Sequence, residues 1–215
     1  MNVEIWADLI CPFCGLGSHR LDQALAAFEH RDDVTVEHRS FMLDPNFPHG
    51  EIRTARAMLR AKYGMTDAQI DANTGAIEAT ARAEGLDPYI VTDNRVGNTA
   101  LAHELLALAA DGGLEGEAWR LLYRHYFGEA GDIFTIDALI DLGVRLGLDA
   151  AGTREALEDR RHADRVLGDI DEARRLGATG VPFIVIDRRY AIAGAQPLET
   201  FTATLQSAWD DSHPS

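Results

Sequence analysis

Strand-like patterns are confined to the two ends of this 215-residue chain, and helical patterns fill the residues between them. At the N-terminal end, residues 3–9 form an apolar run that predicts a buried strand, and the apolar stripe after it predicts a helix to about residue 30. Val34 and Val36 lead into Phe41-Met42-Leu43, which predicts a second strand. The chain therefore opens with a β-α-β unit.

From about residue 51 to residue 165 the hydrophobic period is helical almost without interruption, and we expect no strand there. Glycine, aspartate and proline signals separate the runs. The expected helices cover roughly 51–63, 67–84, 94–111, 115–127, 135–146 and 151–160. We therefore expect an inserted helical domain, 51–164, within a discontinuous domain made of 1–50 and 165–215.

Strand patterns resume after an amphipathic helix over residues 164–176. Val181 to Ile186 is a β-branched apolar run, and residues 190–194 form its hairpin partner. A last helix is expected to begin near Pro197. The C-terminal order is thus α-β-β-α, and the two ends of the chain supply the two halves of one sheet.

Both cysteines of the chain fall in one tetrapeptide, Cys11-Pro12-Phe13-Cys14, between the first strand and the first helix. A cysteine at the start of a helix lies beside unpaired backbone N–H groups and the positive end of the helix dipole, which favour the thiolate. Cys11 is therefore the candidate nucleophile, and Cys14 lies close enough to resolve a mixed disulfide. Pro12 suits the first helical position, where its missing N–H would be unpaired anyway.

Composition and charge exclude several classes of function. With 46% apolar and 26% charged residues the chain is expected to be a soluble globular protein, and its formal net charge of -15 argues against sequence-independent binding to nucleic acid or anionic lipid. No stretch approaches the roughly 18 apolar residues of a membrane span. Because the N-terminus has no signal-peptide pattern, we expect a cytoplasmic protein.

A reducing compartment leaves two explanations for a close cysteine pair, a cycling dithiol or a metal site. A structural zinc site needs four ligands, and the sequence has no second cysteine pair and no suitably spaced histidine pair. We therefore predict no metal.

Segments in both halves of the chain together resemble the DsbA-type thioredoxin family, most closely its FrnE-like branch. These segments are Asp8 to Cys14, Phe41 to Pro45, Asn98 to His103, Tyr126 to Glu129, Gly180 to Phe183 and Gly194 to Pro197. The resemblance runs nearly end to end. It implies an α/β thioredoxin-like fold interrupted by a large all-helical insertion.

The same resemblance implies a thiol-disulfide oxidoreductase or disulfide isomerase that acts on protein or small-molecule thiols and disulfides. It implies no bound cofactor other than the redox-active Cys11–Cys14 disulfide, with glutathione open as a co-substrate. A homodimer is also left open.

The resemblance further implies roles for residues around the dithiol. Val181 is expected to face it, with a cis peptide before Pro182 and backbone groups that pair with an extended substrate. Pro12 and Phe13 complete the expected substrate-binding set. Strongly oxidising members carry a histidine at the position of Phe13, which cannot donate a hydrogen bond to the thiolate, so we expect a milder oxidant. Asp8 is either a proton relay for Cys14 or a turn residue held by local hydrogen bonds.

Two other functions remain as alternatives. The branch of kappa-class glutathione transferases and 2-hydroxychromene-2-carboxylate isomerases shares the inserted-helix architecture, uses glutathione, and has a serine where Cys11 stands. A resolving cysteine would be redundant there, so the paired thiols favour the oxidoreductase. A purely binding domain would leave both cysteines without a role. Asn98 and His103 are given no catalytic role, because a core or interface pair explains them equally well.

Overall fold

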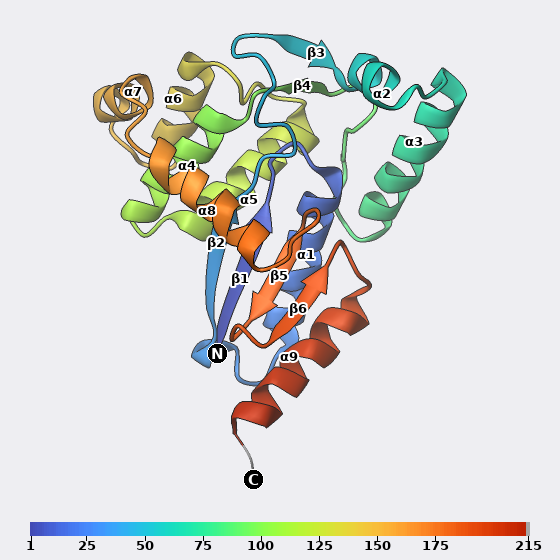
Figure 1. Ribbon diagram of the computed structural model, residues 1–215, viewed down its shortest axis with the longest axis vertical. Helices are drawn as coiled ribbons and strands as arrows, with labels where there is room; N and C mark the ends of the chain where they lie inside the picture. The colour runs from blue at the N-terminus through green and yellow to red at the C-terminus, as the bar shows by residue number, and fades with distance from the viewer. Residues whose placement is uncertain (214–215) are drawn as a thin grey trace. The chain divides into compact units, whose positions relative to one another are not determined.

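A computed structural model describes residues 1–213, which form two compact units (Figure 1). Unit 1 comprises Met1–Leu43 together with the chain from Val166 onward, and unit 2 comprises Asp44–Arg165. This division groups residues 44–50 with the inserted segment, whereas the sequence-based boundaries placed them with the sheet. The sequence-based domain boundaries therefore remain a prediction.

Unit 1 is built around a four-stranded mixed sheet with the order β2-β1-β5-β6 (Figure 1). From the N-terminal end come β1 (Asn2–Ala7) and β2 (Thr35–Ser40), which pair in parallel. From the C-terminal end come β5 (Phe183–Ile186), antiparallel to β1, and β6 (Tyr190–Ala193), antiparallel to β5. The α/β thioredoxin-like fold, with its sheet assembled from both ends, is therefore confirmed.

The core of unit 1 contains β1, whose residues from Val3 to Ala7 are all buried. Trp6 packs with Phe183, Val185 and the helix α8 (Ala163–Arg175), and its indole N–H donates to a backbone carbonyl of α8 at 2.9 Å. The helices α1 (Pro12–Ala27) and α9 (Leu198–Ser212) pack against each other. Burial of the Trp6 side chain against α8 favours one fixed position of α8 on the sheet.

An ion network fixes the C-terminal hairpin to β1. Glu4 is 2% exposed, and its Oε1 accepts hydrogen bonds from Arg39 at 3.2 Å and from Arg188 at 2.6 Å. Arg188 lies in the turn between β5 and β6, and Arg39 also pairs with Asp169 of α8 at 3.4 Å. Because a buried carboxylate that loses its partners is strongly destabilising, the network opposes separation of the two halves of the sheet.

Unit 2 is mostly helical. Its α-helices are α2 (Ala55–Tyr63), α3 (Asp67–Ala83), α4 (Ala100–Asp111), α5 (Glu115–Tyr123), α6 (Ile136–Arg145) and α7 (Ala150–Glu158), and a π-helix (Arg124–Gly128) follows α5. At the start of α3 the Thr66 hydroxyl accepts from the Gln69 N–H while the Gln69 side chain accepts from the Thr66 N–H, a complete capping box. No helix among residues 1–213 is long and apolar enough to span a membrane.

Two sequence-based expectations about strands were wrong. The inserted segment contains β3 (Ile52–Thr54) and β4 (Arg95–Gly97), which pair antiparallel where helix was expected. Three residues are too few to show the alternation of apolar and polar residues that is typical of a strand. Both strands were therefore assigned to the helices predicted next to them. The second strand ends at Ser40, because the backbone then leaves the ladder and the Leu43 N–H donates to a side chain, the carboxylate of Asp8.

Candidate active site

The chain changes from strand to helix at Cys11. After β1 ends, the Cys11 N–H donates to the carbonyl of Asp8 at 3.2 Å, which closes a turn. Cys11 is the N-cap residue of α1 with extended backbone angles, and Pro12 occupies the first helical position. The Cys14 N–H donates to the Cys11 carbonyl at 2.9 Å, so both cysteines belong to the first turn of one helix. The location expected from the sequence is confirmed.

Three of the singled-out residues come together around the sulfur of Cys11. Both cysteines are free thiols, with Cys11 4% exposed and Cys14 fully buried behind it within hydrogen-bonding reach. The Cys11 thiol also donates a weak hydrogen bond to the Val181 carbonyl, with sulfur and oxygen 3.7 Å apart. The peptide bond between Val181 and Pro182 is cis, as expected from the sequence. This cluster joins α1 to the loop that precedes β5.

The surroundings of the Cys14 thiol oppose its ionisation. Burial raises the pKa of Cys14 well above its usual range, and the neighbouring Cys11 thiol and the Asp8 carboxylate act in the same direction. A hydrogen bond from the backbone of Asp8 acts the other way without outweighing burial. Cys14 therefore stays a protonated thiol at neutral pH.

Alkylation of the reduced protein is expected to reveal this shift. Only the thiolate reacts, and a raised pKa leaves a smaller thiolate fraction at every pH below it. The rate at Cys14 should rise about tenfold per pH unit and continue to rise above pH ~9, whereas an ordinary thiol levels off near its pKa of about 8.5. Iodoacetamide labelling read by peptide mass spectrometry follows each cysteine separately, with the urea-unfolded protein as reference. A native Cys14 rate that levels off below pH ~9 would contradict the shift.

The side chain of Asp8 is completely buried beside the dithiol. One carboxylate oxygen accepts a hydrogen bond from the Leu43 N–H at 2.7 Å, and the carboxylate is close enough to Cys14 to affect its ionisation. Its burial next to Cys14 is compatible with a proton relay, and the turn closed at Asp8 together with the bond from Leu43 also fits a turn residue held by local hydrogen bonds, so both interpretations stay predictions.

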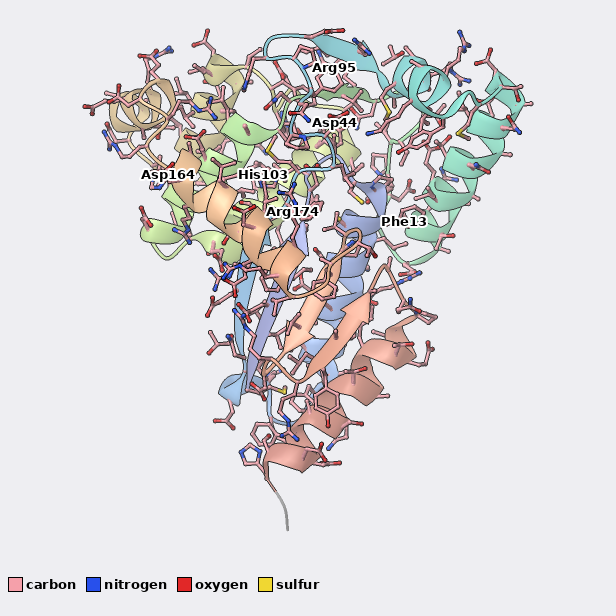
Figure 2. All side chains as sticks on the ribbon, viewed as in Figure 1. Phe13, Asp44, Arg95, His103, Asp164 and Arg174 are labelled. Atoms are coloured by element: carbon pink, nitrogen blue, oxygen red, sulfur yellow. The ribbon has the colours of Figure 1, made fainter. Side chains whose placement is uncertain are left out.

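An exposed apolar side chain lies between the two cysteines of the dithiol. Phe13, between the two cysteines, is 48% exposed at the start of α1 (Figure 2), and Leu43 of the same unit is 43% exposed. Scattered exposed apolar side chains need no explanation, but Phe13 is fixed directly beside Cys11 by the helix that carries both. The Phe13 ring is therefore held at the first turn of α1, next to the residue that carries the Cys11 sulfur.

Two other residues noted in the sequence, Asn98 and His103, lie in unit 2 and make contacts within it. The Asn98 side chain donates to the Phe47 carbonyl at 2.7 Å and accepts from the Ala100 N–H at 3.0 Å. His103 is fully buried and packs against Trp119, with ring centroids 5.7 Å apart. These contacts explain both residues as parts of the core of unit 2.

Sequence reasoning missed residues that hold the loop beside Cys11. Gly17 of α1 packs so closely against Pro182 that a side chain at position 17 would not fit. Arg20 donates hydrogen bonds to two carbonyls of the loop after β6. A glycine inside an apparent helix was the available signal, because such a glycine often marks a close approach of two backbones. Nothing in the sequence indicated which segment approaches.

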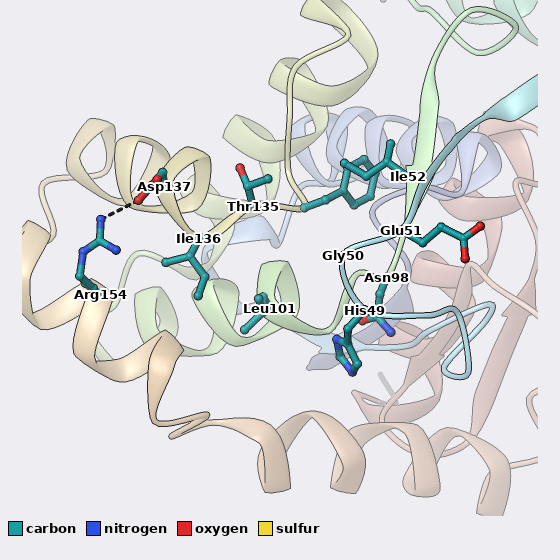
Figure 3. A pocket seen from close by; sticks show the side chains of 11 residues that line it. His49, Gly50, Glu51, Ile52, Asn98, Leu101, Thr135, Ile136, Asp137 and Arg154 are labelled. Atoms are coloured by element: carbon teal, nitrogen blue, oxygen red, sulfur yellow. Dashed lines mark hydrogen bonds and ion pairs between the residues drawn. The ribbon is translucent and has the colours of Figure 1, made fainter.

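Unit 2 also contains a pocket of about 400 Å³ (Figure 3). Part of its polar lining is paired within the protein: Asp137 accepts from Arg154 at 2.6 Å, and Asn98 makes the two bonds described above. The pocket includes neither cysteine, and Asp137 and Arg154 of its lining pair with each other.

Comparisons with known proteins show which family the chain is similar to over most of its length. The profile of the DSBA-like thioredoxin domain matches residues 2–206. A "probable DsbA oxidoreductase" of Streptomyces coelicolor is 44% identical with a TM-score of 0.95, and the match covers 100% of this chain and 92% of that one. The uncharacterized protein YwbO of Bacillus subtilis is 26% identical, over 95% of this chain and 96% of its own. A 2-hydroxychromene-2-carboxylate isomerase shares the fold, with a TM-score of 0.75 at 14% identity and coverage of 99% and 98%.

Proposed function

The chain belongs to the DSBA-like thioredoxin family, and from that membership we propose that it is a thiol-disulfide oxidoreductase or isomerase of the FrnE-like type. Cys11 and Cys14 form its redox couple, and protein or small-molecule thiols and disulfides are its substrates. The observation that carries the proposal is the Cys11 sulfur at a helix N-terminus, 3.7 Å from a loop carbonyl and backed by a buried second thiol.

In the reducing direction, the thiolate of Cys11 attacks one sulfur of a substrate disulfide. A bond forms between that sulfur and Cys11, and the other substrate sulfur leaves as a thiolate that takes up a proton. Cys14 then loses its proton and attacks the Cys11 sulfur, which releases the second substrate thiolate and leaves the Cys11–Cys14 disulfide. The substrate gains two electrons, and the dithiol loses them. Oxidation of a substrate dithiol is the same sequence in reverse.

The second step requires that Cys14 be deprotonated, although its surroundings raise its pKa. In the proposal the buried Asp8 carboxylate accepts this proton and returns it when the dithiol forms again. Val181 and Pro182 align an extended substrate through backbone groups, and Pro12 and Phe13 border the approach to Cys11. The Val181 carbonyl beside the Cys11 sulfur supports this arrangement.

Reduction of insulin by dithiothreitol and reactivation of a scrambled disulfide protein test the activity directly. The wild-type protein should accelerate both reactions, and the doubly alkylated protein should accelerate neither. Binding of glutathione with conjugation to an electrophile, without disulfide exchange, would instead favour the kappa-class alternative. The isomerase similarity at 14% identity concerns the fold alone, so it adds nothing to that alternative.

Replacement Asp8→Asn should slow the resolving step by about 10²-fold, because a proton acceptor typically contributes that much and the amide cannot supply it. Removing the charge also lowers the pKa of Cys14, but Asp8 contributes least among the causes of that shift, so loss of the acceptor should dominate. Rapid-quench measurement of mixed-disulfide decay follows this step alone. Asp32→Asn, at an almost fully exposed carboxylate of the same unit, is the control and should decay as wild type does. Equal decay in both variants would remove Asp8 from the mechanism.

Replacement Phe13→His should make the protein more oxidising. A histidine N–H beside Cys11 stabilises the thiolate, which exists in the reduced form, so the reduction potential rises by roughly 30 mV for each tenfold gain in that form. Equilibration with glutathione buffers, read as the ratio of dithiol to disulfide, measures the change. Phe13→Leu keeps an apolar side chain and should leave the potential near that of the wild type. A potential that falls in Phe13→His would contradict the proposed role of this position.

A further inference from the structure

The contact between α1 and the Val181–Pro182 loop is closer than side chains normally allow. A Cβ atom placed on Gly17 would lie 2.8 Å from Cγ of Pro182 and 3.7 Å from Cα of Ala195. Ordinary van der Waals contact begins near 3.4 Å, so any side chain at this position would force the proline ring to retreat by about 0.6 Å. Gly17 thus lets the helix that carries both cysteines touch the loop that faces them.

A second residue of α1 holds the neighbouring loop in place. Nη1 of Arg20, three residues beyond Gly17 and on the same helical face, donates to the carbonyls of Ala195 at 2.7 Å and Gln196 at 3.0 Å. The two loops are themselves joined, because the Gly194 N–H donates to the Pro182 carbonyl at 2.8 Å. A displacement at either loop is therefore passed to the other.

We propose that Gly17 and Arg20 form a clamp that sets the distance between the Cys11 sulfur and the Val181 carbonyl. They are positioning residues, since Gly17 meets Pro182, Arg20 donates to the loop after β6, and both act on Cys11 through these loops. The clamp rests on the proposed function and deepens it: it favours substrates whose backbone pairs with the loop, namely extended polypeptide disulfides, over disulfides without a peptide backbone. Disulfides without a peptide backbone need to reach only the Cys11 sulfur.

The test compares two disulfides in the full-length protein, insulin and hydroxyethyl disulfide. In Gly17→Ala the displaced Pro182 should lower kcat/KM for insulin about tenfold, mainly through KM, because sub-ångström misplacement of a docking group weakens alignment at the sulfur. Exchange with hydroxyethyl disulfide should stay within about twofold of the wild-type rate, since this molecule has no backbone to dock.

Gly168→Ala is the matched control. Gly168 lies in α8, in the same unit as the dithiol, and an added methyl would meet nothing within 4 Å. This variant should match the wild type with both substrates. Arg20→Gln leaves the helix intact and removes the hydrogen bonds to Ala195 and Gln196, so it should lower the insulin rate in the same selective way, by about threefold. It also keeps the test decisive if Gly17→Ala does not fold.

The outcomes separate the clamp from the proposed function. A wild-type protein that exchanges neither disulfide overturns the function itself. A wild type that exchanges both, with Gly17→Ala and Arg20→Gln equal to it, overturns the clamp alone. Equal losses with the two substrates, matched by a lower melting temperature, would mean that Gly17 only packs the helix and would also overturn the clamp. A selective loss with insulin supports it.

Discussion

A Cys11→Ser variant is expected to lose insulin reduction and disulfide isomerisation by at least about 10³-fold, because a hydroxyl neither ionises near neutral pH nor forms a bond to the substrate sulfur. The change removes one sulfur atom and keeps a group that can donate to the Val181 carbonyl, so the fold should survive. Turnover is measured by insulin turbidity in the presence of dithiothreitol.

The melting temperature of this variant serves as the control for folding and should be close to that of the reduced wild type. A Cys11→Ser protein that is folded and still reduces insulin at the wild-type rate would refute the dithiol mechanism. Activity that disappears together with the folded state would instead call for Cys11→Ala, which removes the nucleophile without adding a polar group.

A Cys14→Ser variant is expected to stop the reaction at the mixed disulfide. Cys11 can still attack, but the buried thiol that should release the adduct is missing, so a mixed disulfide with the substrate accumulates in nearly stoichiometric amount. In a single turnover without an external thiol, release of reduced substrate from the reduced protein should fall by about 10²-fold or more. Non-reducing electrophoresis or intact mass spectrometry detects the adduct, and dithiothreitol should remove it.

The double variant Cys11→Ser/Cys14→Ser is the matched control for this experiment and should form no adduct. If Cys14→Ser trapped nothing while the wild type turned over, Cys11 would not be the attacking thiol. If adducts formed on Cys14 in a Cys11→Ser background, the roles of the two cysteines would be exchanged, contrary to the burial of Cys14.

The strands and helices of unit 1 were predictable because each has a characteristic pattern within its own short segment of sequence. The run from Val181 to Ile186 and its hairpin partner have strand composition, and the first helix follows a strand directly. The pairing of Ile52–Thr54 with Arg95–Gly97 was not predictable, since each strand is three residues long and its partner is remote in sequence. Short strands of this kind depend on tertiary contacts rather than on their own residues.

In the candidate site, too, some features could be predicted from the sequence and others could not. Cys11 and Cys14 are visible as a motif because their spacing is local. The resemblance pointed to Val181, but the distance from its carbonyl to Cys11, the complete burial of Asp8 and the bond from Leu43 exist only in three dimensions. The fit of Gly17 against Pro182 joins residues from opposite ends of the chain, which no periodic pattern can report.

Cys11 and the carbonyl of Val181 are 170 positions apart along the chain. At typical rates of translation Cys11 leaves the ribosome roughly 10 to 30 s before Val181 does. During that interval β1 has no antiparallel neighbour, and the sulfur lacks the oxygen that later flanks it. The reactive centre is thus completed only when synthesis is nearly finished, and any copy truncated before Val181 carries two cysteines without the loop that faces them.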